Sequence, residues 1–437
     1  MLDKEQVNSI IDAMGLGDFS QATIRDIQAL SRVIEEKTGE EVIHLEMGVP
    51  GLQPSEIALK AEAEALKNGC ATIYPPNGGI PRIKKAASDF VKAFIGVDVA
   101  PEGCVPTTGS MQGTFATFTA LHHAFAGTKQ DTVLLIQPGF PVQTTQCDVI
   151  GLKHEALDIY NYRGNDLIAK LEEIISAKGN ICAIVYSNPN NPSWVCFTED
   201  ELKGIGELAT KYDLLVLEDL AYFAMDFRRD LSHPFQAPFQ ATVARYTDNY
   251  VLWVSASKAF SYAGQRIGVT CISNKLFHRT FAPLKEKFGV GTFGDFFVGR
   301  LMYTLSSGTT HSVQHAMSAL MEAAVRGEYN FLDDVKEYGR RAKFMKDVLL
   351  ANGFYLVYDN DMGAPLADGF YFTVQYPGMN DLQLTRELMT YGIAVYPLDT
   401  MGSTQQGVRI CTSFFHREQE QLFTERIKQF HKDHDGR

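Results

Sequence analysis

Residues 181–194, ICAIVYSNPNNPSW, carry the strongest single indication of the fold. The first half is an almost wholly apolar, partly β-branched run, which is typical of a strand covered on both faces. It stops at a turn rich in Asn and Pro. Helical stretches such as 198–212 separate further runs of the same kind, at 132–136, 214–217, 251–254 and 269–272. The sequence therefore predicts an α/β fold with a large doubly wound domain and a mostly parallel (mixed) sheet.

The pattern changes on both sides of this region. The first 45 residues are largely helical, whereas a long charged helix, short strands and a final helix follow residue 320. We expect an N-terminal segment (1–50) that packs with the small domain, a large cofactor-binding domain (51–320) and a small α+β domain (321–437).

Composition excludes several classes of protein. The 437 residues are 45% apolar and carry a net charge of -12, which argues against a nucleic-acid binder. No apolar run approaches the roughly 20 residues of a membrane span, and the polar start lacks a signal-peptide core. Seven widely spaced cysteines without a C-x-x-C pair favour reduced thiols over disulfides or zinc. We expect a cytoplasmic protein with no membrane partner.

Common cofactor and metal motifs are missing. There is no G-x-G-x-x-G after a strand and no phosphate-binding G-x-x-x-x-G-K-[ST]. His311 and His315 are four residues apart, but no H-E-x-x-H accompanies them, so we expect two ordinary helix histidines and no metal.

Polar residues instead follow the expected strands, at the sheet edge where α/β proteins bind ligands. Asn191 follows the run at 181–187, and Asp219 follows the next one. Lys258 lies in a small, apolar context in which its pKa would fall. Gly109 and Ser110, at a helix entry, offer backbone N–H groups to an anion. Taken singly, Asn-Pro turns, a helix-start Asp and a solvated lysine are the ordinary interpretations. Their joint order is harder to explain in that way.

The combination resembles the fold type I pyridoxal-phosphate enzymes, specifically the class I/II aminotransferases of the aspartate aminotransferase superfamily. The resemblance runs from about Ile43 to Thr412 and rests on three motifs: S-x-S-K followed by G-x-R-x-G, N-P-x-N-P, and D-x-x-Y 28 residues after Asn191. It implies pyridoxal 5'-phosphate as cofactor, an amino acid and a 2-oxo acid as substrates, and a homodimer with a shared active site.

The resemblance also assigns the catalytic residues. Lys258 matches the lysine that bonds to the cofactor and later moves the α-proton, for which a neutral amine is needed. Asp219 matches the carboxylate that pairs with the pyridine nitrogen. Asn191 and Tyr222 match the donors to the phenolic oxygen. Arg409 matches the arginine that binds the substrate carboxylate.

The remaining carried-over positions surround the cofactor and the substrate. Phe140 matches the aromatic ring that stacks on the cofactor, and Gly48 matches a loop glycine that closes over the substrate. Tyr74 matches the tyrosine that reaches the phosphate of the neighbouring subunit. The phosphate itself is expected to contact Ser110, Met111, Ser255, Ser257 and Arg266.

Two positions depart from the family pattern. Trp194 stands where N-P-x-N-P-T-G has glycine, which puts the turn in doubt and is expected to place an indole near the substrate entrance. Gly51 replaces an acidic residue of the N-terminal loop.

The leading functional interpretation is a biosynthetic transaminase that works by a ping-pong cycle. Met111 stands where some members have a lysine for acidic side chains, and Phe140, Trp194 and Met111 together would form an apolar wall. A neutral or aromatic amino donor is therefore expected, unless an arginine of the partner subunit serves an acidic one. The alternatives are a carbon–sulfur β-lyase, which shares these motifs, and a non-catalytic regulatory module.

Overall fold

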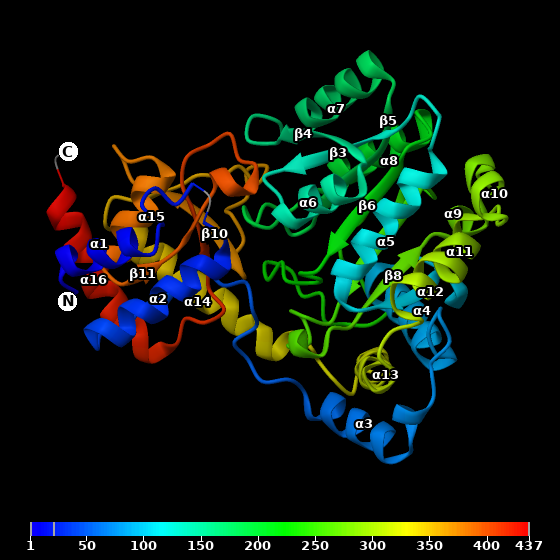
Figure 1. Ribbon diagram of the computed structural model, residues 1–437, viewed down its shortest axis with the longest axis horizontal. Coiled ribbons are helices and arrows are strands. Elements are labelled where there is room, and N and C mark those ends of the chain that lie inside the picture. The colour runs from blue at the N-terminus through cyan, green and yellow to red at the C-terminus, as the bar shows by residue number, and fades with distance from the viewer. Residues whose placement is uncertain (1, 21, 436–437) are drawn as a thin grey trace.

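The computed structural model describes residues 2–20 and 22–435, and its centre is a seven-stranded sheet (Figure 1). The strand order is β2-β8-β7-β6-β5-β3-β4, and only β8 runs against its neighbours. This mixed, mostly parallel sheet agrees with the prediction. The strands are β2 (Cys104–Thr107), β3 (Thr132–Gln137), β4 (Lys153–Asp158), β5 (Ile181–Ser187), β6 (Leu215–Leu220), β7 (Tyr250–Ser255) and β8 (Gly268–Ile272).

Helices cover both faces of this sheet, as the unbroken apolar runs require. Alternate residues of β3 enter different cores: Val133 packs with one helix layer, and Leu134 packs with the other. Helices α5 (Gly109–Ala124), α10 (Ala282–Phe288) and α11 (Phe293–Phe296) contribute to the Val133 core. The opposite core includes α4 (Pro81–Ile95), α7 (Asn165–Lys178), α8 (Glu199–Lys211) and α13 (His311–Val325). Shorter elements at the periphery are α3 (Glu56–Lys67), α6 (Pro141–Ile150), α9 (Asn274–His278) and α12 (Tyr303–Ser306).

The edge strand β4 differs from the central strands. Its sequence, KHEALD, is only partly buried, and Lys153 pairs with Asp131 at 2.6 Å. Lys178 of α7 reaches Glu155 at the same distance. The central strands β5, β6 and β7 are buried throughout.

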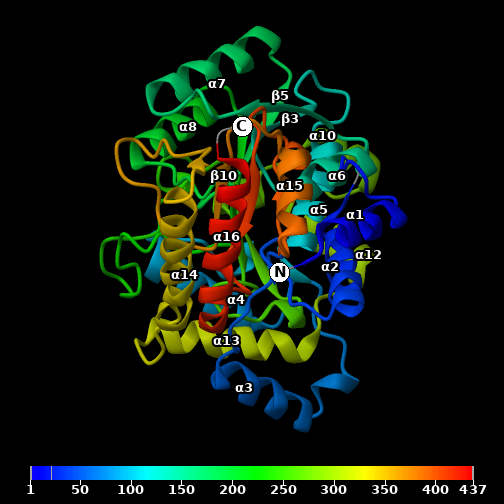
Figure 2. The ribbon, with the colours of Figure 1, turned by 90° about the vertical axis from the view of Figure 1, so that its left-hand side faces the viewer.

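The C-terminal part contains a second, antiparallel sheet beside long helices (Figure 2). Its order is β12-β13-β10-β9, with Thr373 opposite Arg409. The elements are α14 (Leu332–Leu350), β9 (Tyr355–Leu356), β10 (Tyr371–Gln375), α15 (Asp381–Thr390), β11 (Ile393–Ala394), β12 (Tyr396–Pro397), β13 (Val408–Cys411) and α16 (Glu420–His434).

The N-terminal helices lie against this C-terminal part. Helix α1 (Lys4–Ala13) and helix α2 (Ile24–Thr38) share an apolar core with Met389, Tyr396 and Met401. A capping box of Thr23 and Asp26 starts α2. Strand β1 (Ile43–His44) then pairs with β11. The domain division at residues 50 and 320 stays a prediction, and its positions 1, 21, 436 and 437 lie outside the described residues.

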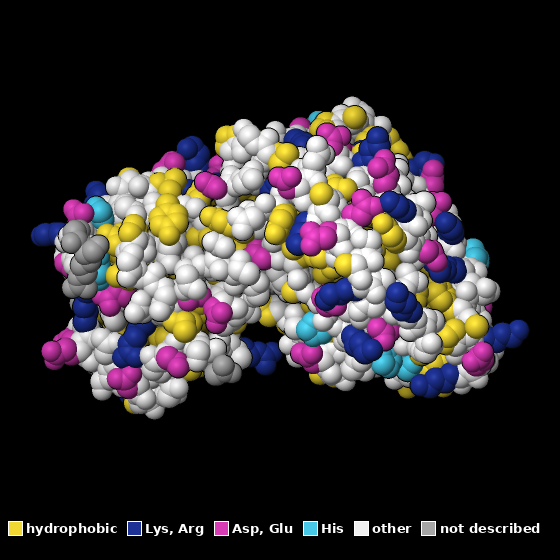
Figure 3. Space-filling model, turned by 90° about the horizontal axis from the view of Figure 1, so that it is seen from above, with side chains coloured by type: hydrophobic (Ala, Val, Ile, Leu, Met, Phe, Trp, Pro, Cys, Tyr) yellow, Lys and Arg dark blue, Asp and Glu magenta, His cyan; other side chains and the backbone are white. Residues whose placement is uncertain are grey.

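The described chain has no helix that is both long and apolar enough to cross a bilayer. On the face shown in Figure 3, basic and acidic side chains are interspersed.

Candidate active site

Lys258 lies just beyond the C-terminal end of β7, on the segment that the sequence singled out. Its ammonium donates a hydrogen bond to the Gly48 carbonyl oxygen and lies 5.5 Å from the centre of the Phe370 ring. Burial lowers the pKa of Lys258 to about 8, and the positive charges of Arg266 and Arg409 act in the same direction. Near neutral pH this amine is therefore much closer to its neutral form than an exposed lysine.

Asp219, near the end of the neighbouring strand β6, is the nearby carboxylate that acts electrostatically on Lys258. Burial raises its pKa to about 6, although it accepts a hydrogen bond from the Ala221 N–H at 3.0 Å. The Gln143 amide donates to its other oxygen at 3.3 Å. Among residues 2–20 and 22–435, Asp219 has two neutral donors and no ion-pair partner, so its carboxylate is suited to a cationic N–H group.

Arg409 and Asn191 meet although they are 218 residues apart. Arg409 belongs to β13 and is 1% exposed, and its Nη1 donates to Asn191 Oδ1 at 3.2 Å. Its Nη2 donates to the Glu46 carbonyl at 2.5 Å, whereas its Nε has no partner among the described residues. A buried guanidinium with an unused N–H is suited to binding a carboxylate.

Tyr222 and Tyr371 bring their hydroxyl groups together. Tyr222 donates to Tyr371 at 3.0 Å, and burial holds the pKa of Tyr222 well above its ordinary value. The Arg409 guanidinium lies 4.5 Å from the centre of the Tyr371 ring. Gly48 is also close, because a Cβ there would lie 2.0 Å from the Tyr371 hydroxyl. Only glycine permits this approach.

An anion-binding arrangement begins at helix α5. Thr108 gives α5 no side-chain cap, but the Gly109 N–H donates to the Arg266 carbonyl oxygen at 3.0 Å. The expected anion contact of the Gly109 N–H is therefore wrong, and the first-turn N–H groups from Ser110 onward are the ones left for an anion. Arg266 packs against Gly109 so closely that a Cβ on this glycine would lie 2.5 Å from Nη2. Ser110 also lies close to Gly268, since a Cβ there would be 3.1 Å from the Ser110 nitrogen. These groups fit a phosphate.

The two predicted serines lie close together, Ser255 as the last residue of β7 and Ser257 two residues beyond it. Ser255 Oγ accepts the Ser257 N–H at 3.1 Å, and both residues are buried. Phe140 caps α6, one turn before Gln143, and is partly buried. Met111 is 36% exposed on α5.

Tyr74 stays apart from the other predicted residues. It is 86% exposed, beside Ile73 at 64%, and lines an open groove with His311. Within one chain its hydroxyl therefore has no role at this site.

The Trp194 indole lies in the core and not near the substrate entrance, where it was expected. Its φ of 64° is the left-handed conformation that glycine usually supplies, so the turn is kept. The indole is 0% exposed and packs behind Tyr222, with ring centres 5.3 Å apart. The expectation of an indole near the substrate entrance is wrong for this conformation, because the turn directs the ring into the core.

Sequence reasoning missed Gln143, Phe370 and Tyr371. Gln143 follows Phe140 by three residues, so it lies on the same side of the helix start. Phe370 and Tyr371 were interpreted only as strand residues, and their contacts depend on pairing between β10 and β13. The sequence feature that could have indicated these two residues is the pair of aromatic side chains directly after Gly369.

Comparison with known proteins gives a consistent result. The family model described as aminotransferase class I and II matches residues 40–427. An aspartate aminotransferase of Pyrococcus horikoshii is 26% identical, and the match covers 52% of this chain and 55% of that protein. An LL-diaminopimelate aminotransferase of Natranaerobius thermophilus is 25% identical over 85% of this chain and 87% of its own.

Solved structures share the fold. A Thermus thermophilus aspartate aminotransferase double mutant has a TM-score of 0.74 at 19% identity and covers 94% of this chain and 96% of its own. A Mycobacterium tuberculosis aminotransferase has a TM-score of 0.75 at 19% identity, with the same shares covered. The predicted fold class is therefore confirmed.

Proposed function

This chain belongs to the class I and II aminotransferases, which are pyridoxal-phosphate-dependent transaminases, and we propose that it transfers the amino group of a neutral or aromatic amino acid to a 2-oxo acid by a ping-pong cycle. The observation that carries this proposal is the convergence of Lys258, Asp219 and Arg409, from three separate elements, in one largely buried space. An amine, a carboxylate and a guanidinium are the groups that this chemistry requires.

Lys258 and Asp219 have complementary roles in the proposal. When bound, the cofactor supplies a covalent attachment point for the amine and a ring that accepts electrons from the substrate α-carbon. The lowered pKa of Lys258 supports a proton-moving role at that carbon, because a neutral amine can accept a proton at neutral pH. Asp219 would hold the pyridine nitrogen in its protonated form.

In this proposal, the other predicted residues bind and orient the cofactor and the substrate. Asn191 and Tyr222 would donate to the phenolic oxygen, and Arg409 would bind the substrate carboxylate through a fork that includes its unpaired Nε. The first turn of α5 and Arg266 would hold the phosphate, with Ser110, Met111, Ser255 and Ser257 as the further predicted contacts.

The neutral-donor preference rests on Met111 and Phe140. A thioether cannot pair with a side-chain carboxylate, and an unpaired charge beside it is costly. Trp194 gives no support, because its indole is fully buried. The name aspartate aminotransferase, carried by the Pyrococcus relative, makes an acidic donor the first competitor.

A half-reaction screen tests the proposal. Each amino acid is added to cofactor-loaded protein, and the absorbance of the pyridoxal form is followed as it converts to the pyridoxamine form. We expect higher kcat/KM for phenylalanine, methionine, leucine or alanine than for aspartate. A clear preference for aspartate would overturn the donor assignment. Thiol release from a cystathionine-like substrate without an acceptor would indicate the β-lyase alternative.

We also propose a homodimer in which Tyr74 completes the phosphate site of the other subunit. The exposure of Tyr74 supports this together with that of Ile73 and Leu66, because the three side chains line one groove and exposed apolar side chains that lie together often mark an interface. Light scattering on cofactor-loaded, active protein should give twice the mass of one chain. A mass of one chain would contradict the shared site.

A biosynthetic role in the cytoplasm completes the proposal. The seven free cysteines, six of them buried, support a reducing compartment.

A further inference from the structure

Trp194 is unusual in both its backbone and its surroundings. The left-handed backbone of Trp194 is unfavourable for a bulky residue, so the surrounding structure must hold it there. The indole is fully buried, and its N–H has no partner among the described residues. A residue kept at such a cost calls for a role beyond filling space.

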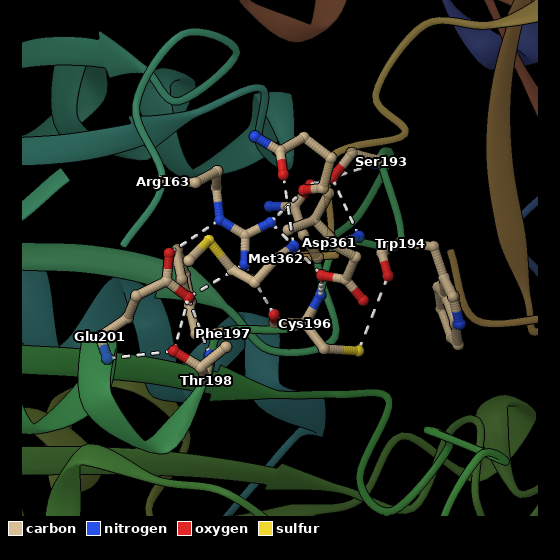
Figure 4. A network of polar contacts seen from close by, with 12 residues as sticks. Arg163, Ser193, Trp194, Cys196, Phe197, Thr198, Glu201, Asp361 and Met362 are labelled. Carbon is tan, nitrogen blue, oxygen red and sulfur yellow. Dashed lines mark hydrogen bonds and ion pairs between the residues drawn. The ribbon is translucent and has the colours of Figure 1, made fainter. Parts of the chain in front are cut away.

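Hydrogen bonds from both ends of the turn hold this backbone in place. The Trp194 N–H donates to the Asn190 carbonyl at 2.9 Å, and the Asn190 side-chain oxygen accepts from the Ser193 N–H at 3.1 Å. Beyond the turn, the Cys196 N–H donates to Asp361, which belongs to the C-terminal part, at 3.1 Å (Figure 4). These hydrogen bonds hold the turn without any contribution from the indole ring.

The indole occupies space that Gly369 leaves open. A Cβ at residue 369 would lie 2.1 Å from Trp194 Cε2 and equally close to Nε1. The φ of Gly369 is not in the left-handed region, so the missing side chain, rather than the backbone, is what this glycine contributes. The large side chain of Trp194 thus fills the space beside Gly369, and we call these two residues the matched pair.

The other side of the indole faces two tyrosines. Its ring centre lies 5.3 Å from that of Tyr222 and 6.1 Å from that of Tyr371, both in edge-to-face orientation. Such aromatic contacts are directional and hold ring orientation. These are the two rings whose hydroxyl groups are hydrogen-bonded at 3.0 Å.

We propose that Trp194 is a positioning residue whose indole, seated against Gly369, fixes the Tyr222–Tyr371 hydroxyl pair. The Tyr222 hydroxyl has one proton, which it donates to Tyr371 in this structure. When that proton is donated to the phenolic oxygen of the cofactor, the hydrogen bond between the tyrosines reverses, and Tyr371 donates to the Tyr222 oxygen and orients it. The ring of Tyr371 also supports Arg409. This inference rests on the proposed function, because Tyr222 is assigned there to the phenolic oxygen of the cofactor.

The pH titration of the bound cofactor's visible absorbance, without substrate, tests this role. A misplaced Tyr222 donor stabilises the ionised phenolic oxygen less, which raises the pH midpoint. Trp194→Gly should raise the midpoint by about one unit and lower kcat/KM by about 100-fold, the size expected for a displacement near 1 Å. Trp194→Phe keeps a ring and should recover most of both. An unchanged midpoint in both variants would overturn the proposal.

Two further variants separate the causes of a negative result. Tyr222→Phe should raise the midpoint at least as far as Trp194→Gly; if it does not, the assignment of Tyr222 fails and the inference fails with it. Trp253→Phe is the matched control, because Trp253 is an equally buried tryptophan on β7. It should lower stability while the midpoint stays in place. An equal shift in Trp253→Phe would mean that general loosening, not positioning, moves the midpoint.

Gly369→Ala tests the matched pair even if Trp194→Gly does not fold. Beside Trp194 the added methyl group should displace the indole and raise the midpoint, whereas in the Trp194→Gly background it should add little. Equal effects in both backgrounds would contradict the pairing.

Fluorescence locates the indole without the cofactor. The chain has two tryptophans, so in Trp253→Phe the emission comes from Trp194 alone. We expect weak quenching by acrylamide in the cofactor-free protein. Quenching as strong as that of a free indole would overturn the inference while the proposed function stands.

Discussion

Lys258 and Arg163 are two largely buried cations with opposite surroundings. Arg163 forms ion pairs with Glu201 at 2.8 Å and Asp361 at 3.3 Å, and it also donates to the Cys196 carbonyl at 2.9 Å (Figure 4). Burial alone would lower the pKa of Arg163, but these carboxylates more than offset it, so its pKa is raised. Lys258 forms no ion pair with a carboxylate in the described part of the chain, and burial lowers its pKa.

This difference separates a structural cation from a reactive one. All five N–H groups of Arg163 have hydrogen-bond partners among the described residues, which leaves none of them to bind a ligand. Lys258 can lose its proton near neutral pH, which a stabilising ion pair would prevent. Burial therefore has different consequences at the two residues. At Arg163 it encloses ion pairs that stabilise the fold, and at Lys258 it favours the neutral amine that proton transfer needs.

Replacing Lys258 should give the largest effect. Lys258→Ala is expected to abolish turnover, because the amine that bonds to the cofactor and moves the α-proton would be lost. Cofactor should still bind weakly through its phosphate. Single-turnover absorbance measures the rate, and more than a few per cent of the original activity would contradict the lysine assignment.

Asp219→Ala should cost about 10³-fold in rate, because the ring nitrogen would lose its proton. Asp219→Asn is the size-matched control and should be similarly slow, since an amide cannot carry the charge. A loss of less than about tenfold in both variants would remove Asp219 from the pyridine-nitrogen role.

Arg163→Met should affect stability rather than chemistry. Removing one partner of a buried ion pair costs about 3–5 kcal/mol of unfolding free energy. Urea unfolding measures this, and the rate per folded molecule should change less than about tenfold. The control is Arg279→Met, whose partner Asp213 is exposed, with an expected loss below about 1 kcal/mol. Equal losses of unfolding free energy in Arg163→Met and Arg279→Met would contradict a special structural role for the buried Arg163.

The smallest effect is a pH dependence of stability in the cofactor-free protein. The folded pKa of Lys258 is about 8 and the ordinary value is 10.5, so the unfolded chain binds the extra proton between these values. Lys258 therefore costs up to about 3 kcal/mol below pH 8, and this cost disappears as the pH rises toward 10.5. Lys258→Met should be more stable than the original protein at pH 7 and equal to it near pH 10.5. A difference independent of pH would contradict the lowered pKa.

The fold was predictable because local apolar runs encode buried strands. The apolar runs that begin at residues 181 and 214 fall on β5 and β6. The run at 214–217 was too short, however, because β6 extends to Leu220 and therefore contains Asp219, which was expected to follow the strand. The strand ends thus indicate the edge of the sheet at which Lys258 and Asp219 lie, whereas their roles are implied by the family resemblance and stay predictions.

The rest depends on contacts between distant residues. Tyr371 and Tyr222 are 149 positions apart, and no local sequence pattern predicts the hydrogen bond between them. The burial of Trp194 depends on the missing side chain of Gly369 and on Asp361, 165 positions from Cys196. Such pairings follow from tertiary packing and cannot be derived from spacing.

Strand β4 has a consequence for how the protein behaves in concentrated solution. Its outer backbone edge is the last of the seven-stranded sheet, and an open edge can recruit a strand from another molecule. Lys153 and Glu155 place opposite charges along this edge, each already paired within the chain. A strand that added here would bring its own side chains beside these charges, so we expect them to disfavour aggregation through this edge.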